Sequence, residues 1–437
     1  YNVAVGYNAG FAVSTGTSNT LIGGQAGDAL TTGGSNTLVG KGAGGALTEG
    51  DNNTAIGASA LASEDTQGRN VAVGKEALTT LNAGSDAYNV AVGFEAGKLV
   101  STGIKNTIIG GLAGDALTTG ADNVALGYGA LSTEDTGSRN VAIGMNAMNT
   151  FDYNGNGYCV AIGYEAGVLM SSGRFNTLLG ASTGAAITTG ASNTALGYRA
   201  LYSNVDGDNN VAVGYRALYT LDPASNEDMY NVAVGYDAGQ LMTTGIDNTI
   251  VGGAAGTALT SGGGNVVIGS GALATEDETG RVVAIGTNAL ATQNTAANSY
   301  NVAIGYNAST ASTTGAENTI VGSFAGDAIT SASTCVLMGV HAGGALELGG
   351  ANVAIGHSAL RSETDYGNNV AIGEQALTAQ DAGATAYNVA VGYKAGVAVS
   401  TGVDNVFIGG GAGDAVTTSG RNVAIGREAF STEDAVG

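Results

Sequence analysis

Short apolar runs recur along the chain at a fixed spacing, each opened by a polar residue and closed by a glycine. Residues 2–6 (Asn-Val-Ala-Val-Gly) form the first run, and the same frame returns from Asn19 and Asn36 onward to Asn422. Most steps between runs are 17 residues, a few are 19 and one is 21. A short period kept over a whole chain is typical of a solenoid. We therefore predict an all-β parallel β-solenoid of about 25 coils of 17 residues.

The three residues after the opening asparagine predict a strand. If the repeat is numbered from its asparagine, positions two and four carry Val, Thr, Ile, Leu or Met, and position three is mostly Ala. Such residues favour strands, in which alternate side chains point to opposite faces. Because both faces are apolar, we expect both to be buried. One face would pack inside the coil, and another subunit is the simplest partner for the other.

Two positions of the repeat are nearly invariant. Position five is glycine in every repeat, as in Gly6, Gly23 and Gly40. It predicts a bend with positive φ, or a contact too close for a Cβ atom. Position one is asparagine in most repeats, beginning with Asn2, Asn19, Asn36, Asn53 and Asn70. We predict an asparagine ladder in which each amide bonds the next coil or its own turn, and we favour its own turn because asparagine commonly bonds nearby backbone.

The large apolar residue that follows the alanine of position eight occurs at two places. Leu61 and Leu78 follow this alanine at once, at position nine. In other repeats position nine is glycine, and the bulk comes three residues later, as Leu30 and Val100. We expect two backbone routes that fill an equivalent core volume.

The repeats are grouped, mostly in fours, with a second period near 70 residues. A tyrosine precedes the first repeat of each group. We predict one continuous solenoid over residues 1–437, with super-repeats at 1–87, 88–157, 158–229, 230–299, 300–386 and 387–437. Long loops end the groups at residues 79–88, 149–158, 219–230, 291–300 and 378–387.

Composition and charge exclude several classes of protein. With 75 Gly, 1 Pro and 44% hydrophobic residues, the chain is neither collagen nor disordered. Its net charge of -22 would repel nucleic acid and anionic membranes. No apolar run approaches the ~20 residues of a membrane helix, so we expect no membrane insertion of this segment. No nucleophile elbow, phosphate loop or Ser/His/Asp set is present, so we expect neither enzyme activity nor a cofactor.

Metal and disulfide chemistry have little support. His341 and His357 lie one repeat apart with no further ligand beside them, and structural zinc takes four ligands, so we expect no metal there. Cys159 and Cys335 both replace the asparagine of position one and are ten coils apart, or ~48 Å at strand spacing. That distance excludes an intrachain disulfide. We expect buried thiols, and contact between symmetric copies across subunits stays open.

Acidic turns recur mainly in the third repeat of a group, at Glu64-Asp65, Glu134-Asp135, residues 276–278, residues 363–365 and Glu433-Asp434. Calcium favours such oxygen clusters. The spacing of a calcium-binding loop is missing, however, so we favour solvated turns and keep calcium as the alternative.

Residues 140–147 (Asn-Val-Ala-Ile-Gly-Met-Asn-Ala) and 53–61 (Asn-Thr-Ala-Ile-Gly-Ala-Ser-Ala-Leu) carry a resemblance that extends over the whole chain. They resemble the head repeats of trimeric autotransporter adhesins of the YadA type, and more closely the repeats of phage tail fibres. The resemblance implies a left-handed β-roll, a homotrimer and a role in attachment, outside the cell, on a cell surface or a virion. The coils here are longer than those head repeats, so their cross-section differs.

We therefore expect the structural shaft or adhesive body of an extracellular fibre, which binds copies of itself and a host-surface glycan or protein. Contacts would come from the long loops, at Phe151, Tyr153, Tyr219, Asp222 and Asp381, where aromatic rings would stack on sugars or pin the loop. An ice-binding solenoid is one alternative, because threonine pairs such as Thr31-Thr32 recur. A self-assembling filament subunit is another, because neither end shows a polar cap.

Overall fold

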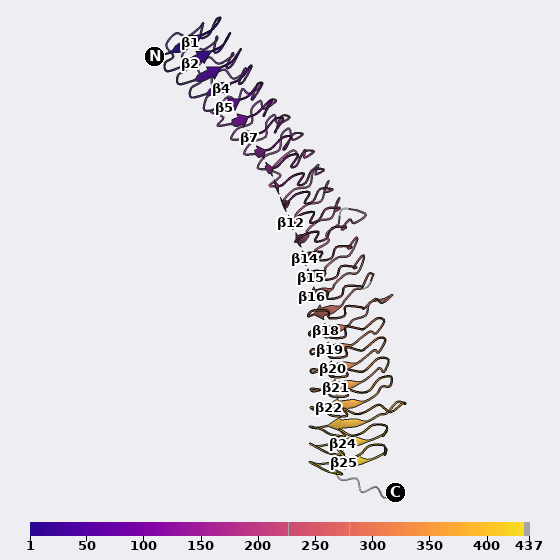
Figure 1. The fold of residues 1–437 in the computed structure, drawn as a ribbon. Helices are drawn as coiled ribbons and strands as arrows, with labels where there is room; N and C mark the ends of the chain where they lie inside the picture. The colour runs from indigo at the N-terminus through magenta and orange to yellow at the C-terminus, as the bar shows by residue number, and fades with distance from the viewer. Residues whose placement is uncertain (226, 279, 432–437) are drawn as a thin grey trace. The chain divides into compact units, whose positions relative to one another are not determined.

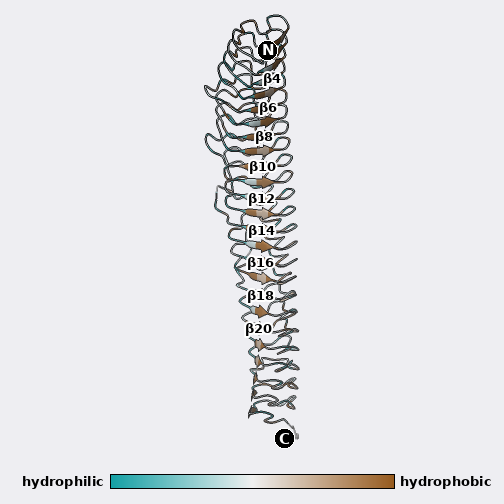
Figure 2. Ribbon diagram, turned by 90° about the vertical axis from the view of Figure 1, so that its left-hand side faces the viewer, coloured by the Kyte–Doolittle hydropathy of each residue, from teal (hydrophilic) through white to brown (hydrophobic). Residues whose placement is uncertain are grey.

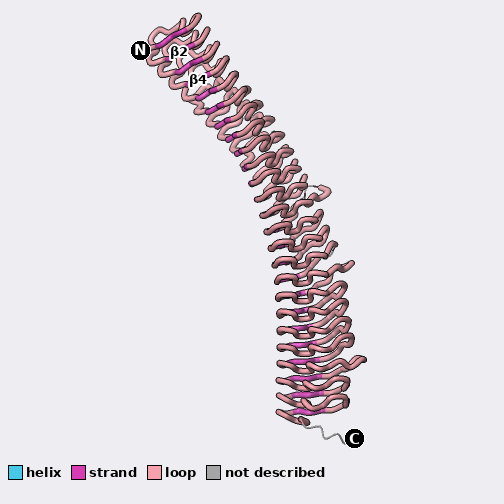
Figure 3. The backbone as a smooth tube through the Cα atoms, viewed as in Figure 1, coloured by secondary structure: helices cyan, strands magenta, loops and turns pink. Residues whose placement is uncertain are grey.

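A computed structural model describes residues 1–225, 227–278 and 280–431. These residues form 25 short parallel β-strands and no helix, so the protein is an all-β parallel solenoid. Each strand is three residues long, and turns make up most of the chain between strands (Figure 3). Accordingly, the described residues contain no helix of the length and apolar character needed to cross a membrane. The chain divides into two compact units, which are described separately below.

The first unit comprises Tyr1–Tyr215 and Asp222–Asp228. Each of its strands pairs in parallel with the next one along the chain (Figure 1). The same repeat positions face each other throughout, as in the pairs Val3 with Thr20 and Ala4 with Leu21. The strands are β1 (Val3–Val5), β2 (Thr20–Ile22), β3 (Thr37–Val39), β4 (Thr54–Ile56), β5 (Val71–Val73), β6 (Val90–Val92), β7 (Thr107–Ile109), β8 (Val124–Leu126), β9 (Val141–Ile143), β10 (Val160–Ile162), β11 (Thr177–Leu179), β12 (Thr194–Leu196) and β13 (Val211–Val213).

The second unit comprises Arg216–Leu221 and Met229–Gly437, and its strands pair in the same way. In both units the strands carry hydrophobic residues (Figure 2). The strands are β14 (Val232–Val234), β15 (Thr249–Val251), β16 (Val266–Ile268), β17 (Val283–Ile285), β18 (Val302–Ile304), β19 (Thr319–Val321), β20 (Val336–Met338), β21 (Val353–Ile355), β22 (Val370–Ile372), β23 (Val389–Val391), β24 (Val406–Ile408) and β25 (Val423–Ile425).

The core of each coil is built from three recurring positions. In the coil of β7, Ile108 at position three, Ala113 at position eight and Leu117 at position twelve are all fully buried. The two flanking strand residues, Thr107 and Ile109, point the other way and are half-buried. Within a single chain, therefore, only one of the two apolar strand faces is closed.

The glycine of position five meets both conditions that the sequence predicted. Gly93 has φ +144°, and a Cβ atom placed on it would lie 2.4 Å from the carbonyl oxygen of Gly110 in the next coil. Its N–H donates to the carbonyl of Val73 in the preceding coil at 2.8 Å. The bend and the close stacking of backbones therefore both require glycine here.

The prediction of two backbone routes after the alanine is wrong. Leu78 and Gly97 both stand at position nine, and both adopt left-handed φ, +49° and +57°. The difference lies in the neighbours, since a Cβ atom on Gly97 would lie 2.8 Å from Cδ1 of Ile108. Glycine makes room for a bulky strand residue in the next coil. Where leucine stands instead, burial of its side chain, worth about 2 kcal/mol, offsets the cost of left-handed φ, about 1–2 kcal/mol.

Candidate functional site

The five residues predicted to contact a ligand differ in exposure. Phe151 is fully buried and fills the core beneath its loop, so it pins the loop and does not stack on a sugar. Tyr153 and Tyr219 are half-buried, whereas Asp222 and Asp381 are exposed. The five belong to three different long loops, so any ligand contact would be repeated along the chain and not gathered in one pocket.

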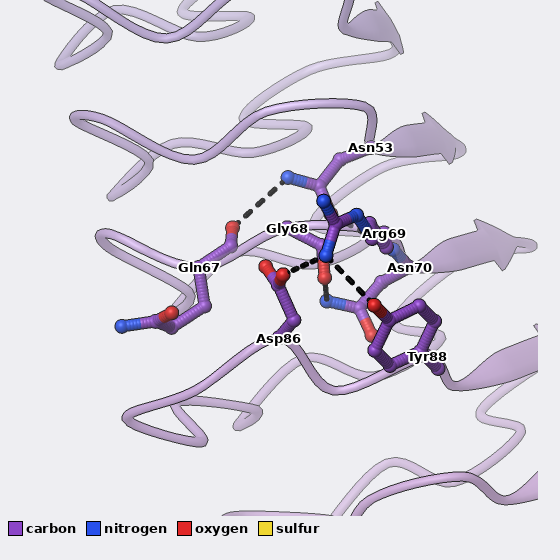
Figure 4. Close-up of polar contacts among 7 residues, drawn as sticks. All are labelled: Asn53, Gln67, Gly68, Arg69, Asn70, Asp86 and Tyr88. Atoms are coloured by element: carbon purple, nitrogen blue, oxygen red, sulfur yellow. Dashed lines mark hydrogen bonds and ion pairs between the residues drawn. The ribbon is translucent and has the colours of Figure 1, made fainter.

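At several long loops, the final tyrosine is held by an arginine of the preceding coil. Arg69 donates to the hydroxyl of Tyr88 at 2.7 Å and forms an ion pair with Asp86 (Figure 4). Arg139 makes the same bond to Tyr158 at 2.8 Å. Both tyrosine rings are 49% exposed. These loops therefore present an aromatic ring beside a guanidinium group. In the sequence, the tyrosine only marked the start of a group of repeats, and its pairing with an arginine was not predicted.

The asparagines of position one form a buried ladder along each unit. The side-chain oxygen of Asn19 accepts the backbone N–H of Asn36 at 2.9 Å, and its Nδ2 donates to the carbonyl of Gly33 at 2.9 Å. Asn2 and Asn53 bond the chain 14 and 17 residues further on in the same way. Bonding to the asparagine's own turn, which we favoured, is wrong for these residues. The ladder joins successive coils and leaves few buried amides unpaired.

The ladder changes in the repeat that contains a long loop. Asn53 donates 14 residues ahead, whereas Asn70 donates to a carbonyl two residues back (Figure 4). In the equivalent repeats, the Nδ2 atoms of Asn140 and Asn369 are buried without a partner among the described residues. The longer loop thus removes the usual acceptor. Val282 replaces asparagine in a repeat of this kind, where the side-chain amide of an asparagine would have few hydrogen-bond partners.

The outward strand residues are Val or Thr at position two and Val, Ile, Leu or Met at position four, and they form a largely apolar stripe, which we call the outer strand face. Leu179 and Leu196 lie opposite each other in β11 and β12, and each is 42% exposed. Exposed residues of this face recur in both units, at Ile22, Ile56, Leu126, Leu179, Leu196, Ile268, Met338 and Ile408. Most of the other outward strand residues are half-buried, so the apolar stripe is partly open to solvent in a single chain.

The glutamate of each described acidic turn is buried, which contradicts our prediction of solvated turns. Glu64, Glu134, Glu276 and Glu363 all stand at position twelve and are fully buried. Only the residues that follow them are half-buried or exposed. The turn at Glu433-Asp434 lies outside the described residues.

One of these turns brings three carboxyl groups together. Ligand oxygens of Glu134, Asp135 and Asp152 lie within 4.8 Å of one another. The two oxygens of Glu134 already accept the N–H groups of Gly137 at 2.5 Å and Tyr153 at 3.2 Å. Calcium takes six to eight oxygen ligands, so this cluster by itself does not define a calcium site.

The two histidines lie near each other on the surface of the second unit. The ring centroids of His341 and His357 are 6.5 Å apart, and His341 stacks on Phe324 at 5.1 Å. Among the described residues, no group of three or more potential metal ligands includes either histidine. A shallow pocket of about 410 Å³ beside His341 is also lined by Asp327 and Arg361. The histidines act here as ring neighbours in a surface stack.

Cys159 and Cys335 are free and buried, as the sequence predicted. Burial raises the pKa of the Cys159 thiol to about 11, and it also raises the pKa of Cys335. Because the thiolate is the reactive form, these thiols should be inert in the folded chain.

We expect both thiols to react with an aromatic disulfide reagent at pH 8 at least about 100-fold more slowly in the folded protein than in denaturant, since the thiolate is scarce and shielded. The released thiolate is followed by its absorbance. A Ser172→Cys variant, which places a thiol at an exposed position, serves as the control and should label rapidly. Equal labelling rates for native and denatured wild-type protein would contradict the burial.

Threonine hydroxyls form hydrogen bonds between successive coils. Thr31 donates through its hydroxyl to the carbonyl of Thr48 at 3.1 Å, and Thr118 donates to the carbonyl of Asp135 at 2.9 Å. Ice binding needs a regular array of free threonine side chains. The bonded hydroxyls do not favour that function.

No known protein family matches the chain, and no curated protein matches its sequence. The outer strand face and the long loops are the features of this chain that bear on its function.

Proposed function

We propose that the chain is the shaft or adhesive body of an extracellular fibre, such as a trimeric surface adhesin or a phage tail fibre. In this proposal each 17-residue repeat is one coil of a left-handed β-roll, and three copies pack around a common axis. The observation that carries it is the outer strand face, which is apolar in successive coils and partly open in a single chain. The resemblance of the repeats to those families supports the same assembly.

The energetics of the outer strand face favour self-association. Burying the exposed part of one leucine or isoleucine contributes about 1 kcal/mol. Repeated over about two dozen coils, this gain exceeds the ~4–15 kcal/mol that association costs in lost freedom. The net charge of -22 keeps the remaining surface soluble.

The long loops supply the attachment function in this proposal. They recur about every four coils, and each loop that ends in a tyrosine held by arginine presents a partly exposed ring, as at Tyr88 and Tyr158. Asp222 and Asp381 add exposed acceptors. A host-surface glycan or protein that binds one loop weakly would be held by several loops, because linked weak contacts gain affinity through multivalency.

Charged residues on the outer strand face should break the assembly. We expect the wild-type chain to sediment as a trimer and Leu179→Glu/Leu196→Glu to sediment as a monomer, because the carboxylates would be buried against copies of themselves. Analytical ultracentrifugation measures the mass. The matched control is Asn82→Glu/Ser172→Glu, which adds the same charge at exposed positions outside the strands and should remain a trimer.

A wild-type chain that stays monomeric at all accessible concentrations would overturn the assembly. The attachment role is tested separately, on a glycan array and with loop-shortened variants at residues 149–158 and 378–387. If the trimer binds no glycan and shortened loops leave attachment to host cells unchanged, the chain is a passive spacer.

A further inference from the structure

Position twelve forms a column of side chains in the centre of the coils, which we call the core column. Leu47, Glu64 and Leu81 occupy it in three successive coils, and all three are fully buried. In the second unit, Leu346 and Glu363 occupy position twelve of two successive coils and are also fully buried. A carboxyl group therefore sits where the preceding coil places leucine, and the ionised form of a carboxyl group is costly to bury there. The coil after Glu363 places the buried Gln380 at this position, and its amide offsets part of that cost.

Two of these carboxyl groups have few partners. Oε1 of Glu64 accepts the N–H of Gln67 at 3.2 Å, and Oε1 of Glu363 accepts the N–H of Tyr366 at 3.1 Å. The Oε2 atoms of both are buried without a hydrogen-bond partner among the described residues. Glu134, in contrast, has a backbone donor for each oxygen. Glu64 and Glu363 are thus the two sites where a negative charge would be least compensated.

The charged groups around Glu64 do not supply a counter-ion. Asp65 on its own turn is half-buried and acidic, and Glu49 on the preceding coil is exposed. On the following coil Asp86 is already paired with Arg69. The electrostatic surroundings of Glu64 therefore also disfavour its ionised form.

The surroundings of Glu363 are similar. Asp381 on the following coil is acidic and exposed, as are Asp365 on its own turn and Glu347 on the preceding coil. Arg361 is exposed and lines the pocket beside His341. No ion pair involving Glu363 occurs among the described residues.

The chain contains its own neutral version of this site. Asn204 occupies position twelve in the equivalent repeat of another group and is fully buried. Its Oδ1 accepts the N–H of Gly207 at 3.1 Å, and its Nδ2 donates to the Gly207 carbonyl at 2.8 Å. A neutral side chain therefore satisfies the turn, and the turn does not need a negative charge.

We propose that Glu64 and Glu363 are held as neutral carboxylic acids in the folded chain, and that they make a fold that strengthens in acid and weakens toward neutral pH. Burial raises the pKa of each side chain to about 7. In the unfolded chain glutamate has its ordinary pKa of about 4.3. Between these values the folded state binds more protons, so stability is full below about pH 4.3, falls as pH rises and is constant above about pH 7. This pH dependence of folding stability does not depend on the proposed fibre role.

The test compares two double variants of the full chain. Between pH 5 and pH 8 we expect the folded-to-unfolded ratio of the wild type to fall on the order of tenfold to a hundredfold per site, from the shift in pKa. Glu64→Gln/Glu363→Gln removes both groups and should reduce this dependence, leaving the contribution of carboxyl groups such as Glu134, whose pKa is also raised by burial. Glu49→Gln/Glu347→Gln removes two exposed carboxylates of adjacent coils and should keep the wild-type slope.

Two further measurements keep the test decisive. Asn204→Glu installs a third such group and should steepen the dependence. The infrared C=O band of a protonated carboxylic acid should be present in wild-type protein at pH 6 and weaker in Glu64→Gln/Glu363→Gln. A wild-type pH slope retained in Glu64→Gln/Glu363→Gln, or an unchanged infrared band, would overturn the proposal.

Discussion

Replacing Gly93 by alanine is expected to destabilise the folded chain by about 3 kcal/mol or more. A Cβ atom at this position would lie 2.4 Å from the carbonyl oxygen and 2.6 Å from the carbonyl carbon of Gly110, and both are backbone atoms. The φ of +144° adds strain of about 1–3 kcal/mol for any L-residue. The two coils must separate, which also weakens the hydrogen bond between them that the N–H of Gly110 donates to the carbonyl of Val92 at 2.8 Å. Urea unfolding, together with amide hydrogen exchange of the local coils, measures the loss.

The control for this prediction is Gly111→Ala in the adjacent coil. Gly111 lies outside the left-handed region, and the nearest atom to a Cβ there is Cδ2 of Tyr128 at 3.6 Å, an ordinary contact. We expect a change within about 0.5 kcal/mol. If both variants unfold at the same urea concentration as the wild type, the close backbone approach is not what selects glycine at position five.

Removing one asparagine of the ladder is expected to have the second largest effect. Asn106 accepts the backbone N–H of Asn123 at 3.0 Å and donates to the carbonyl of Gly120 at 2.8 Å, and all these groups are buried. Asn106→Ala leaves a donor and an acceptor unpaired inside the chain. Each unpaired group costs about 1–3 kcal/mol, so we expect a loss of about 2–5 kcal/mol in the free energy of unfolding.

The ladder itself provides the comparison for this variant. Asn140 accepts only a longer bond, 3.3 Å, from the N–H of Cys159, and its Nδ2 has no partner among the described residues. Asn140→Ala should therefore cost about 1–2 kcal/mol less than Asn106→Ala. Hydrogen exchange at the amides of Asn123 and Cys159 reports each site directly. Equal losses in the two variants would show that packing, and not hydrogen bonding, maintains the ladder.

The sequence predicted the features that each repeat imposes on itself. Three apolar residues between asparagine and glycine predict a strand, and the register follows because every repeat offers the same positions to the next. The glycine of position five, as at Gly93 and Gly110, reflects a positive φ and a close backbone contact that recur from coil to coil. The outward residues likewise predicted a second apolar strand face, which is partly exposed in a single chain.

Only the stacked structure shows which loop and turn side chains are buried. Phe151 and Tyr153 are two residues apart in one loop, yet the first is in the core and the second is half-buried. The polar sequence neighbours of Glu64 predicted a solvated turn, but its side chain lies between the buried side chains of Leu47 and Leu81.

In both cases the environment is set by residues about 17 positions away, in the coils before and after. The strand and the bend depend on backbone preferences local to one repeat, which the repeated sequence displays directly. Burial, amide partners and the state of a carboxyl group depend on contacts between coils. Those contacts exist only once the coils are stacked.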